Sequence, residues 1–196
     1  GPETSETLIA EALHPYPDGL VIATKGGFTR QGPNRWTPNG RPEHLRAACE
    51  ASLRRLRLER IDLYYLHTVD PAVPLEESLG ALAGLREEGK IRQVGISNVD
   101  VAQLARARAA IEVAAVQNRL SLGERGSRPV LDACERHAIP FVAWAPLAKG
   151  FFAGAGGPVA EIAVRRGATP AQVVLAWVLR LSPVTVAIPG TSSVAH

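Results

Sequence analysis

Residues 20–27, LVIATKGG, are five apolar or small residues followed by a lysine and two glycines. Short runs of this kind, rich in β-branched residues and without strict alternation, are typical of strands covered on both faces. Five more runs share this character, at 61–66, 91–96, 112–116, 139–145 and 184–188. Amphipathic helices are expected at 5–13, 42–56, 75–88, 100–109, 127–137 and 170–179. A strand–helix repeat without hairpin signals predicts parallel strands joined by right-handed crossovers.

Local signals support this alternation. Asp100 with Gln103, and Thr169 with Gln172, form cap pairs at the starts of two expected helices. Two Gly-rich segments, 26–41 and 149–158, are expected to be loops.

Residues capable of chemistry follow every expected strand. They are Lys25, His67, Ser97, Asn98, Gln117, Asn118, Trp144, Gly190, Thr191, Ser192 and Ser193. In a barrel, all strands deliver such residues to one face, whereas in an open doubly wound sheet they gather at one switch point. The segment after Lys25 also lacks the G-x-G-x-x-G fingerprint of an open dinucleotide-binding sheet. The pattern favours an α/β barrel over an open sheet, although six strands are too few to close a (β/α)8 barrel.

Composition excludes several classes of function. Only 5% of the residues are aromatic and the formal net charge is +3, so nucleic acid is not an expected partner. No apolar run of membrane-spanning length occurs, and no metal-ligand spacing is seen. Cys49 and Cys134 fall on apolar helix faces, which indicates core residues in a reducing compartment.

Each strand-end residue also has an ordinary structural interpretation. Lys25 could extend its stem along apolar surface, and His67 could be a hydrogen-bonded core residue. Asn98 could serve only as a helix cap, and Trp144 could simply be part of the core. Their joint occurrence at successive strand ends is what favours a functional site.

Six segments resemble, in order and spacing, the strand-end motifs of the aldo-keto reductases. They are LVIATKGG (20–27), IDLYYLH (61–67), VGISNV (94–99), VQNRLS (116–121), VAWAPLAKG (142–150) and IPGTSS (188–193). The resemblance implies a (β/α)8 TIM barrel over residues 1–196 that is incomplete, with six of eight strands. It also implies a cytoplasmic oxidoreductase that uses NADP(H) to reduce a small-molecule carbonyl substrate to an alcohol. It implies neither a membrane nor a nucleic-acid partner.

The family's catalytic set is an aspartate, a tyrosine, a lysine and a histidine. By resemblance, Lys25 is the lysine, which lowers the pKa of the proton-donating tyrosine, and His67 polarises the carbonyl. The implied cofactor contacts are Ser97, Asn98 and Gln117 for the nicotinamide carboxamide, Trp144 for ring stacking, Leu147 and Gly150 for the pyrophosphate, and Gly190, Thr191, Ser192 and Ser193 around the 2′-phosphate. Many members have a lysine in place of Gly190, so NADP preference over NAD is expected but not fixed.

The sequence also departs from the family pattern. The family's tyrosine stands just before a segment like GPETSE (1–6), and its aspartate stands a few residues earlier. Tyr16 lies in a proline-flanked loop, and Tyr64 and Tyr65 are interpreted as core residues. The chain also contains no methionine. We therefore expect an internal fragment that lacks two leading strands and the last helix, is inactive alone and folds poorly.

Two other functions stay open. Lys25 could form a Schiff base in a different barrel enzyme, or the barrel could be a non-catalytic, cofactor-binding subunit that docks a protein partner. The identity of the carbonyl substrate would depend on the loops at 26–41 and 120–127.

Overall fold

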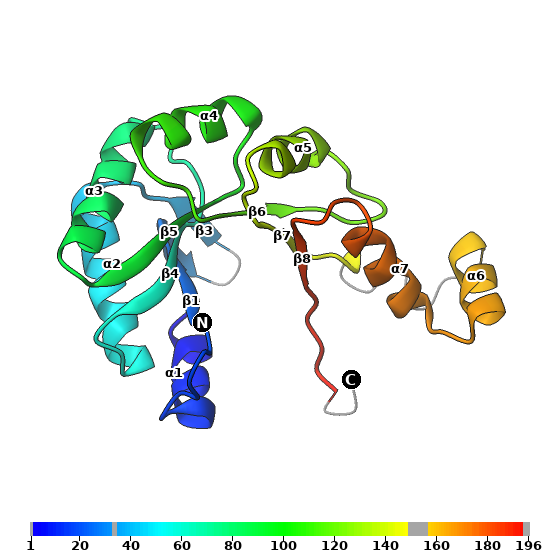
Figure 1. The fold of residues 1–196 in the computed structure, drawn as a ribbon. Coiled ribbons are helices and arrows are strands. Elements are labelled where there is room, and N and C mark those ends of the chain that lie inside the picture. Colours follow the sequence, from blue (N-terminus) through cyan, green and yellow to red (C-terminus); the bar gives the residue numbers. More distant parts are fainter. Residues whose placement is uncertain (1, 33–34, 149–156, 194–196) are drawn as a thin grey trace. The chain divides into compact units, whose positions relative to one another are not determined.

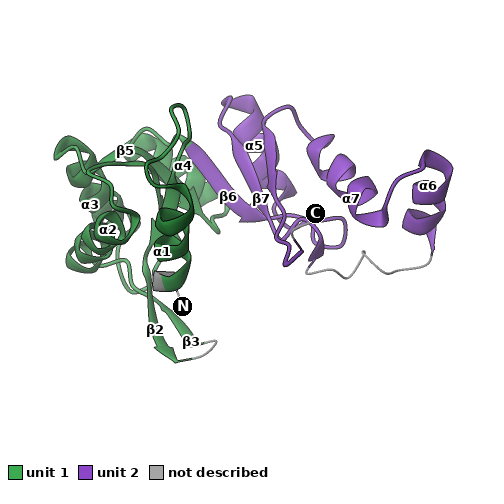
Figure 2. Ribbon diagram, turned by 90° about the horizontal axis from the view of Figure 1, so that it is seen from below, with its two compact units in different colours: residues 1–114 green, residues 115–196 purple. Residues whose placement is uncertain are grey.

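The computed structural model describes residues 2–32, 35–148 and 157–193. The chain divides into two compact units, residues 1–114 and residues 115–196 (Figure 2). Both units are built from parallel strands and helices, as the sequence predicts. The described residues contain no helix with both the length and the apolar character needed to cross a bilayer.

Unit 1 is built on three parallel strands. Its elements are α1 (Pro2–Leu13), β1 (Ala23–Gly26), β2 (Phe28–Gly32), β3 (Arg35–Pro38), α2 (Pro42–Leu56), β4 (Ile61–Leu66), α3 (Leu75–Glu87), β5 (Ile91–Ser97) and α4 (Val101–Ala110) (Figure 1). Strand β4 pairs with β1 on one side and with β5 on the other, both in parallel. Helices α2 and α3 pack against each other along one face of these strands.

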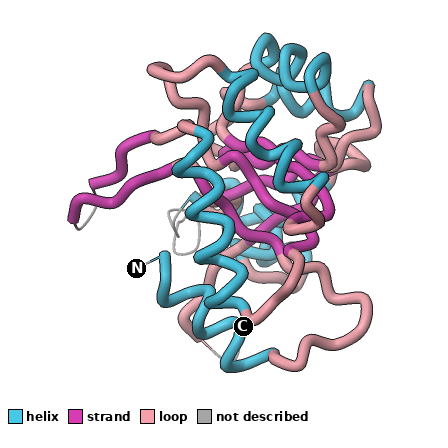
Figure 3. The backbone as a smooth tube through the Cα atoms, turned by 90° about the vertical axis from the view of Figure 1, so that its left-hand side faces the viewer, coloured by secondary structure: helices cyan, strands magenta, loops and turns pink. Residues whose placement is uncertain are grey.

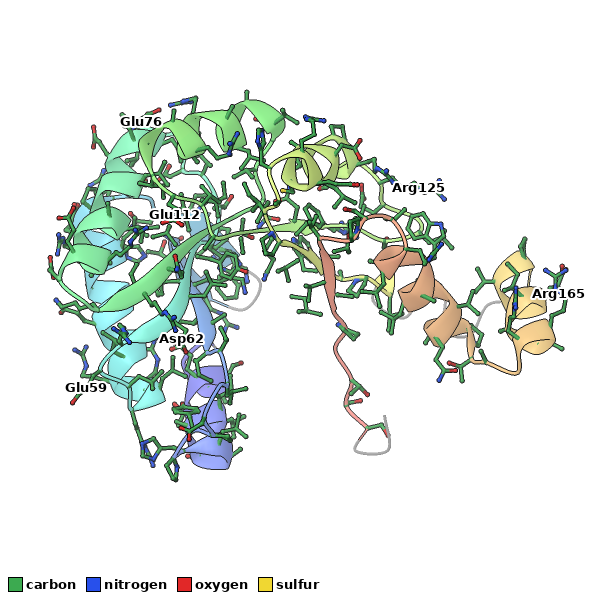
Figure 4. The ribbon with its side chains drawn as sticks, viewed as in Figure 1. Glu59, Asp62, Glu76, Glu112, Arg125 and Arg165 are labelled. Carbon is green, nitrogen blue, oxygen red and sulfur yellow. The ribbon has the colours of Figure 1, made fainter. Side chains whose placement is uncertain are left out.

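The two faces of the three strands differ in character. Because successive side chains alternate, Tyr64 and Leu66 lie on one face of β4 and Tyr65 lies on the other. The first face belongs to the apolar core, which is completed by fully buried leucines of the helices, Leu45, Leu56, Leu79, Leu82 and Leu85. Acidic residues such as Glu59, Glu76 and Glu112, labelled in Figure 4, are exposed at the surface of the unit. The opposite face of the strands is left for Lys25 and its neighbours.

Segment 26–41, expected to be a loop, contains an antiparallel hairpin. Strand β2 pairs with β3, with Arg30 opposite Trp36 and Phe28 opposite Pro38. Figure 3 shows the hairpin projecting from the parallel strands. The prediction of no hairpin was wrong because each strand is only four or five residues long and a register shift between Arg30 and Gly32 interrupts the pattern.

Unit 2 repeats the parallel arrangement. Its elements are β6 (Ala115–Arg119), α5 (Arg128–Arg136), β7 (Phe141–Trp144), α6 (Pro158–Arg166), α7 (Pro170–Leu179) and β8 (Thr185–Ile188). Strand β7 pairs in parallel with β6 and with β8. Helix α6 was not anticipated, although Pro158 opens it and Gly167, at φ 59°, ends it.

Several element boundaries differ from the predicted ones. Strand β1 begins at Ala23 because the amide of Ile22 donates to the Asp62 carboxylate, at 3.0 Å, and not to a strand carbonyl. Residues 112–114 precede β6, although the amide of Ala114 still donates to the carbonyl of Val94. Both predicted capping boxes, at Asp100 and Thr169, are present. Cys49 and Cys134 are buried free thiols, as expected of core residues.

Candidate functional site

The carboxyl ends of β1, β4 and β5 bring four of the predicted site residues of unit 1 into neighbouring positions. Lys25 is in register with Tyr65, and Tyr65 is in register with Gly95. His67 comes two residues after Tyr65 and Ser97 two residues after Gly95, so both share the face that carries Lys25. This face is the one turned away from α2 and α3.

Lys25 rests on an aromatic ring. Its Nζ lies 5.5 Å from the centroid of the Tyr65 ring, which is 2% exposed. Burial lowers the pKa of the Lys25 ammonium from its usual value. Among the described residues, no carboxylate forms an ion pair with Lys25. The ammonium is therefore a poorly hydrated cation that could accept a carboxylate partner.

His67 is fixed from two sides. Its amide donates to the carbonyl of Gly26 at 2.8 Å, which ties the ends of β4 and β1 together. Its ring meets the Phe28 ring edge-to-face, with centroids 4.7 Å apart. Burial, together with the charge of Lys25, lowers the pKa of His67 to about 4. The imidazole is therefore neutral at neutral pH and can donate one hydrogen bond while accepting another.

Ser97 and Asn98 lie beside His67. The Asn98 amide donates to the carbonyl of His67 at 3.0 Å and to the Ser97 hydroxyl at 3.2 Å. Asn98 has a φ of 56°, a conformation that asparagine tolerates better than most residues. Ser97 is buried, at 1% exposed. Asn98 thus fixes the end of β5 against the end of β4.

A cleft of about 710 Å³ in unit 1 is lined by residues of α1, β1, the hairpin and α2, together with His67. Lys25, Phe28, Arg30, Trp36 and His67 are among the residues that line it. A volume of this size suits a small ligand. Sequence reasoning singled out segment 26–41 as a determinant of the substrate, but it named none of the three hairpin residues Phe28, Arg30 and Trp36.

The remaining predicted residues lie in unit 2. Gln117 and Asn118 are buried at the end of β6, and Trp144 ends β7 with its ring partly exposed. The Arg119 guanidinium lies 5.5 Å from the centroid of the Trp144 ring, a partner that the sequence analysis did not anticipate.

Leu147 is partly exposed in the segment after β7, and Gly150 lies outside the described residues. Gly190, Thr191, Ser192 and Ser193 are exposed after β8. There the amide of Ser193 donates to the Thr191 hydroxyl at 3.1 Å.

The three tyrosines of unit 1 are either hydrogen-bonded to the backbone or buried. The Tyr16 hydroxyl donates to the carbonyl of Leu56 at 2.8 Å, near the end of α2. Tyr64 and Tyr65 are both buried, Tyr64 on the core face of β4 and Tyr65 on the face that carries Lys25, and burial raises the pKa of Tyr64. The hydrogen bond of Tyr16 and the burial of Tyr64 favour the interpretation that neither is the proton donor beside Lys25.

The depressed pKa of His67 predicts a pH-dependent stability. Unfolded histidine titrates near pH 6.5, so the unfolded state binds more protons than the folded state between about pH 6.5 and pH 4. We expect the free energy of unfolding to fall by about 2 kcal/mol across this window, relative to a His67→Gln variant that cannot titrate there. Urea titrations of the two forms, each containing this chain within a whole barrel, between neutral pH and about pH 4.5 measure the difference. Parallel curves for the two proteins would contradict a buried neutral imidazole.

Comparisons with known proteins match the chain to one family. The model of the aldo/keto reductase family matches residues 1–196. An uncharacterized oxidoreductase of Schizosaccharomyces pombe is 44% identical over the whole chain, which spans 64% of that protein. Pyridoxine 4-dehydrogenase of Escherichia coli is 38% identical over the whole chain, which spans 70% of it.

Solved structures show the same fold. A glycerol dehydrogenase from Gluconobacter oxydans matches 96% of the chain with a TM-score of 0.87 and 28% identity, and the match covers 68% of that protein. An aldo-keto reductase from Klebsiella pneumoniae, solved in complex with NADPH, matches 99% of the chain with a TM-score of 0.82 and 30% identity, over 67% of its own length. The six parallel strands thus correspond to part of a (β/α)8 barrel, the fold predicted from the sequence.

Proposed function

Because the chain belongs to the aldo/keto reductase family, we propose that it carries part of the active site of an NADP(H)-dependent reductase that converts an aldehyde or ketone to an alcohol by hydride transfer. The observation that supports this most is that Lys25 and His67 lie at the ends of the neighbouring strands β1 and β4. One residue supplies a poorly hydrated cation and the other a neutral imidazole. Both kinds of group favour carbonyl reduction, because negative charge develops on the carbonyl oxygen.

The donor groups present suit a nicotinamide cofactor. In unit 1, Ser97 and Asn98 offer a hydroxyl and an amide at the end of β5. In unit 2, the amide of Gln117 can both donate to and accept from a carboxamide, and the Trp144 ring offers a surface for stacking. The exposed hydroxyls of Thr191, Ser192 and Ser193 can donate to phosphate oxygens. We assign Leu147 and Gly150 to the segment that would lie beside the cofactor's pyrophosphate, and Gly190 to the turn that would lie beside its 2′-phosphate.

In this proposal, Lys25 and His67 have distinct roles. Bound NADPH supplies the hydride. The neutral His67 ring donates a hydrogen bond to the substrate oxygen and holds it in place. The Lys25 ammonium stabilises the phenolate of a tyrosine acid and so lowers the pKa of that tyrosine.

The tyrosine and an aspartate that pairs with Lys25 would come from outside residues 1–196. The lack of a carboxylate partner for Lys25 among the described residues supports this part of the proposal.

A turnover assay tests the function. In a protein that contains this chain within a whole barrel, we expect NADPH absorbance to fall when an aldehyde such as benzaldehyde is added, with one alcohol formed per NADPH consumed. NADPH binding without turnover of any aldehyde or ketone would favour the non-catalytic barrel instead.

Burial of Lys25 also gives substance to the Schiff-base alternative, since a lowered lysine pKa favours the nucleophilic amine. Borohydride treatment in the presence of a carbonyl compound decides between the two. We expect no added mass on the peptide containing Lys25. A stable adduct at Lys25, without NADPH consumption, would replace the reductase proposal by the aldolase-type one.

A further inference from the structure

The β2–β3 hairpin presents one chemically distinct face. Because Arg30 is opposite Trp36 and Phe28 is two residues before Arg30, these three side chains lie on the same side of the two-stranded ribbon. Thr37 lies on the opposite side and lines a separate, smaller depression. We call the first set, Phe28, Arg30 and Trp36, the hairpin wall.

The hairpin wall adjoins His67 directly. The Phe28 ring meets the His67 ring at 4.7 Å and the Trp36 ring at 5.9 Å, both edge-to-face. Trp36 is 45% exposed, which is unusual for so large an apolar side chain, and it lines the 710 Å³ cleft together with Lys25 and His67. The aromatic surface therefore begins beside the imidazole and continues outward along the cleft, where a planar ring could pack against it.

Arg30 adds a positive charge to this surface. Its guanidinium lies 5.3 Å from the centroid of the Trp36 ring, and its Nε donates to the carbonyl of Gly32 at 3.2 Å. Among the described residues, no carboxylate forms an ion pair with Arg30. The cleft's buried acid, Glu6, is already bound by Arg55 and Thr24. The net charge presented to a ligand by Lys25 and Arg30 is positive.

We propose that the hairpin wall determines substrate specificity and selects carbonyl compounds that carry a planar ring and a carboxylate. The ring packs against Trp36 and Phe28, the carboxylate pairs with Arg30, and the carbonyl lies beside His67. The proposal rests on the reductase function proposed above, which sets where the carbonyl lies. An arginine held on a tryptophan face is well suited to bind a carboxylate through two parallel hydrogen bonds.

Steady-state kinetics with three aldehydes separate the two parts of the hairpin wall. In a protein with the whole barrel, Arg30→Gln should raise the KM for 4-carboxybenzaldehyde about tenfold and leave benzaldehyde unchanged. Trp36→Leu should raise the KM for both aromatic aldehydes about fivefold to tenfold and leave propanal unchanged. Thr37→Ala, on the other side of the ribbon, is the matched control and should change none of the three. Equal effects of Arg30→Gln on all three aldehydes would overturn the proposal.

A binding measurement tests the hairpin wall without turnover. The chain has three tryptophans, so Trp144→Phe with Trp177→Phe leaves Trp36 as its sole tryptophan reporter. Titration with 4-(hydroxymethyl)benzoate should change the Trp36 emission, and adding Arg30→Gln should weaken that binding about tenfold. If no aldehyde is reduced but this titration behaves as expected, the reductase function fails and the hairpin wall stands as a ligand site.

Two outcomes of the binding measurement overturn the proposal. One is a Trp36 emission that does not respond to 4-(hydroxymethyl)benzoate. The other is a loss of NADPH affinity in Arg30→Gln with Trp144 and Trp177 intact, which would assign the arginine to a cofactor phosphate.

Discussion

Lys25→Met is expected to lower kcat for carbonyl reduction by about a thousandfold or more, while the Kd for NADPH changes less than about twofold. Methionine keeps an unbranched stem of similar length, so the packing against the Tyr65 ring is largely retained. What is lost is the cation that stabilises the negative charge developing during proton transfer. A thousandfold loss corresponds to about 4 kcal/mol of transition-state stabilisation. Stopped-flow measurement of a single turnover, together with NADPH fluorescence titration, separates the chemical step from binding.

Lys90→Met provides the matched control. Lys90 also belongs to unit 1, but its Nζ pairs with Glu50 at 2.6 Å and with Glu88 at 3.1 Å on the surface. The same chemical change at that position should leave kcat unchanged, because a surface ion pair contributes little and lies outside the cleft. Retained activity in Lys25→Met, or an equal loss in both variants, would remove Lys25 from the catalytic set.

The sequence predicted the part of unit 1 that local periodicity determines. Helix α2, at 42–56, and strand β4, at 61–66, have the predicted bounds, because each has an uninterrupted pattern and clear end signals. The position of Lys25 next to His67 follows from parallel pairing alone, since the ends of neighbouring parallel strands lie together. Both residues could therefore be predicted from the sequence as members of one site.

The hairpin could not be predicted in the same way. Its pairing depends on contacts across the ribbon, such as Arg30 over Trp36, and on the packing of Phe28 against His67, which is remote in sequence. The pKa of His67 is a similar case, because its depression arises from burial by residues of other elements and from the charge of Lys25. These features arise from tertiary packing, and no single window of the sequence contains them.

Gly95→Ala is the substitution for which we expect the largest loss of stability. A Cβ at Gly95 would lie well inside contact distance of two ring atoms of Tyr65, on the next strand. The Tyr65 ring cannot retreat easily, because it is 2% exposed and Lys25 lies over it. Overpacking of this kind costs about 2 to 3 kcal/mol in the free energy of unfolding. The displaced ring should also move Lys25, so activity should fall in the protein that remains folded.

Gly80→Ala makes the experiment decisive, because it adds the same methyl group where there is room for it. Gly80 lies on the exposed side of α3, and nothing lies within 4 Å of a Cβ placed there. Alanine favours a helix over glycine, so this variant should gain about 0.5 to 1 kcal/mol in stability and keep full activity. Urea unfolding of Gly95→Ala, Gly80→Ala and the unsubstituted protein, each with the whole barrel, measures both effects. The dependence of the unfolding free energy on urea concentration is compared among the three. A Gly95→Ala variant as stable as the parent would mean that Tyr65 does not occupy the space beside β5, and the support of Lys25 by that ring would have to be abandoned.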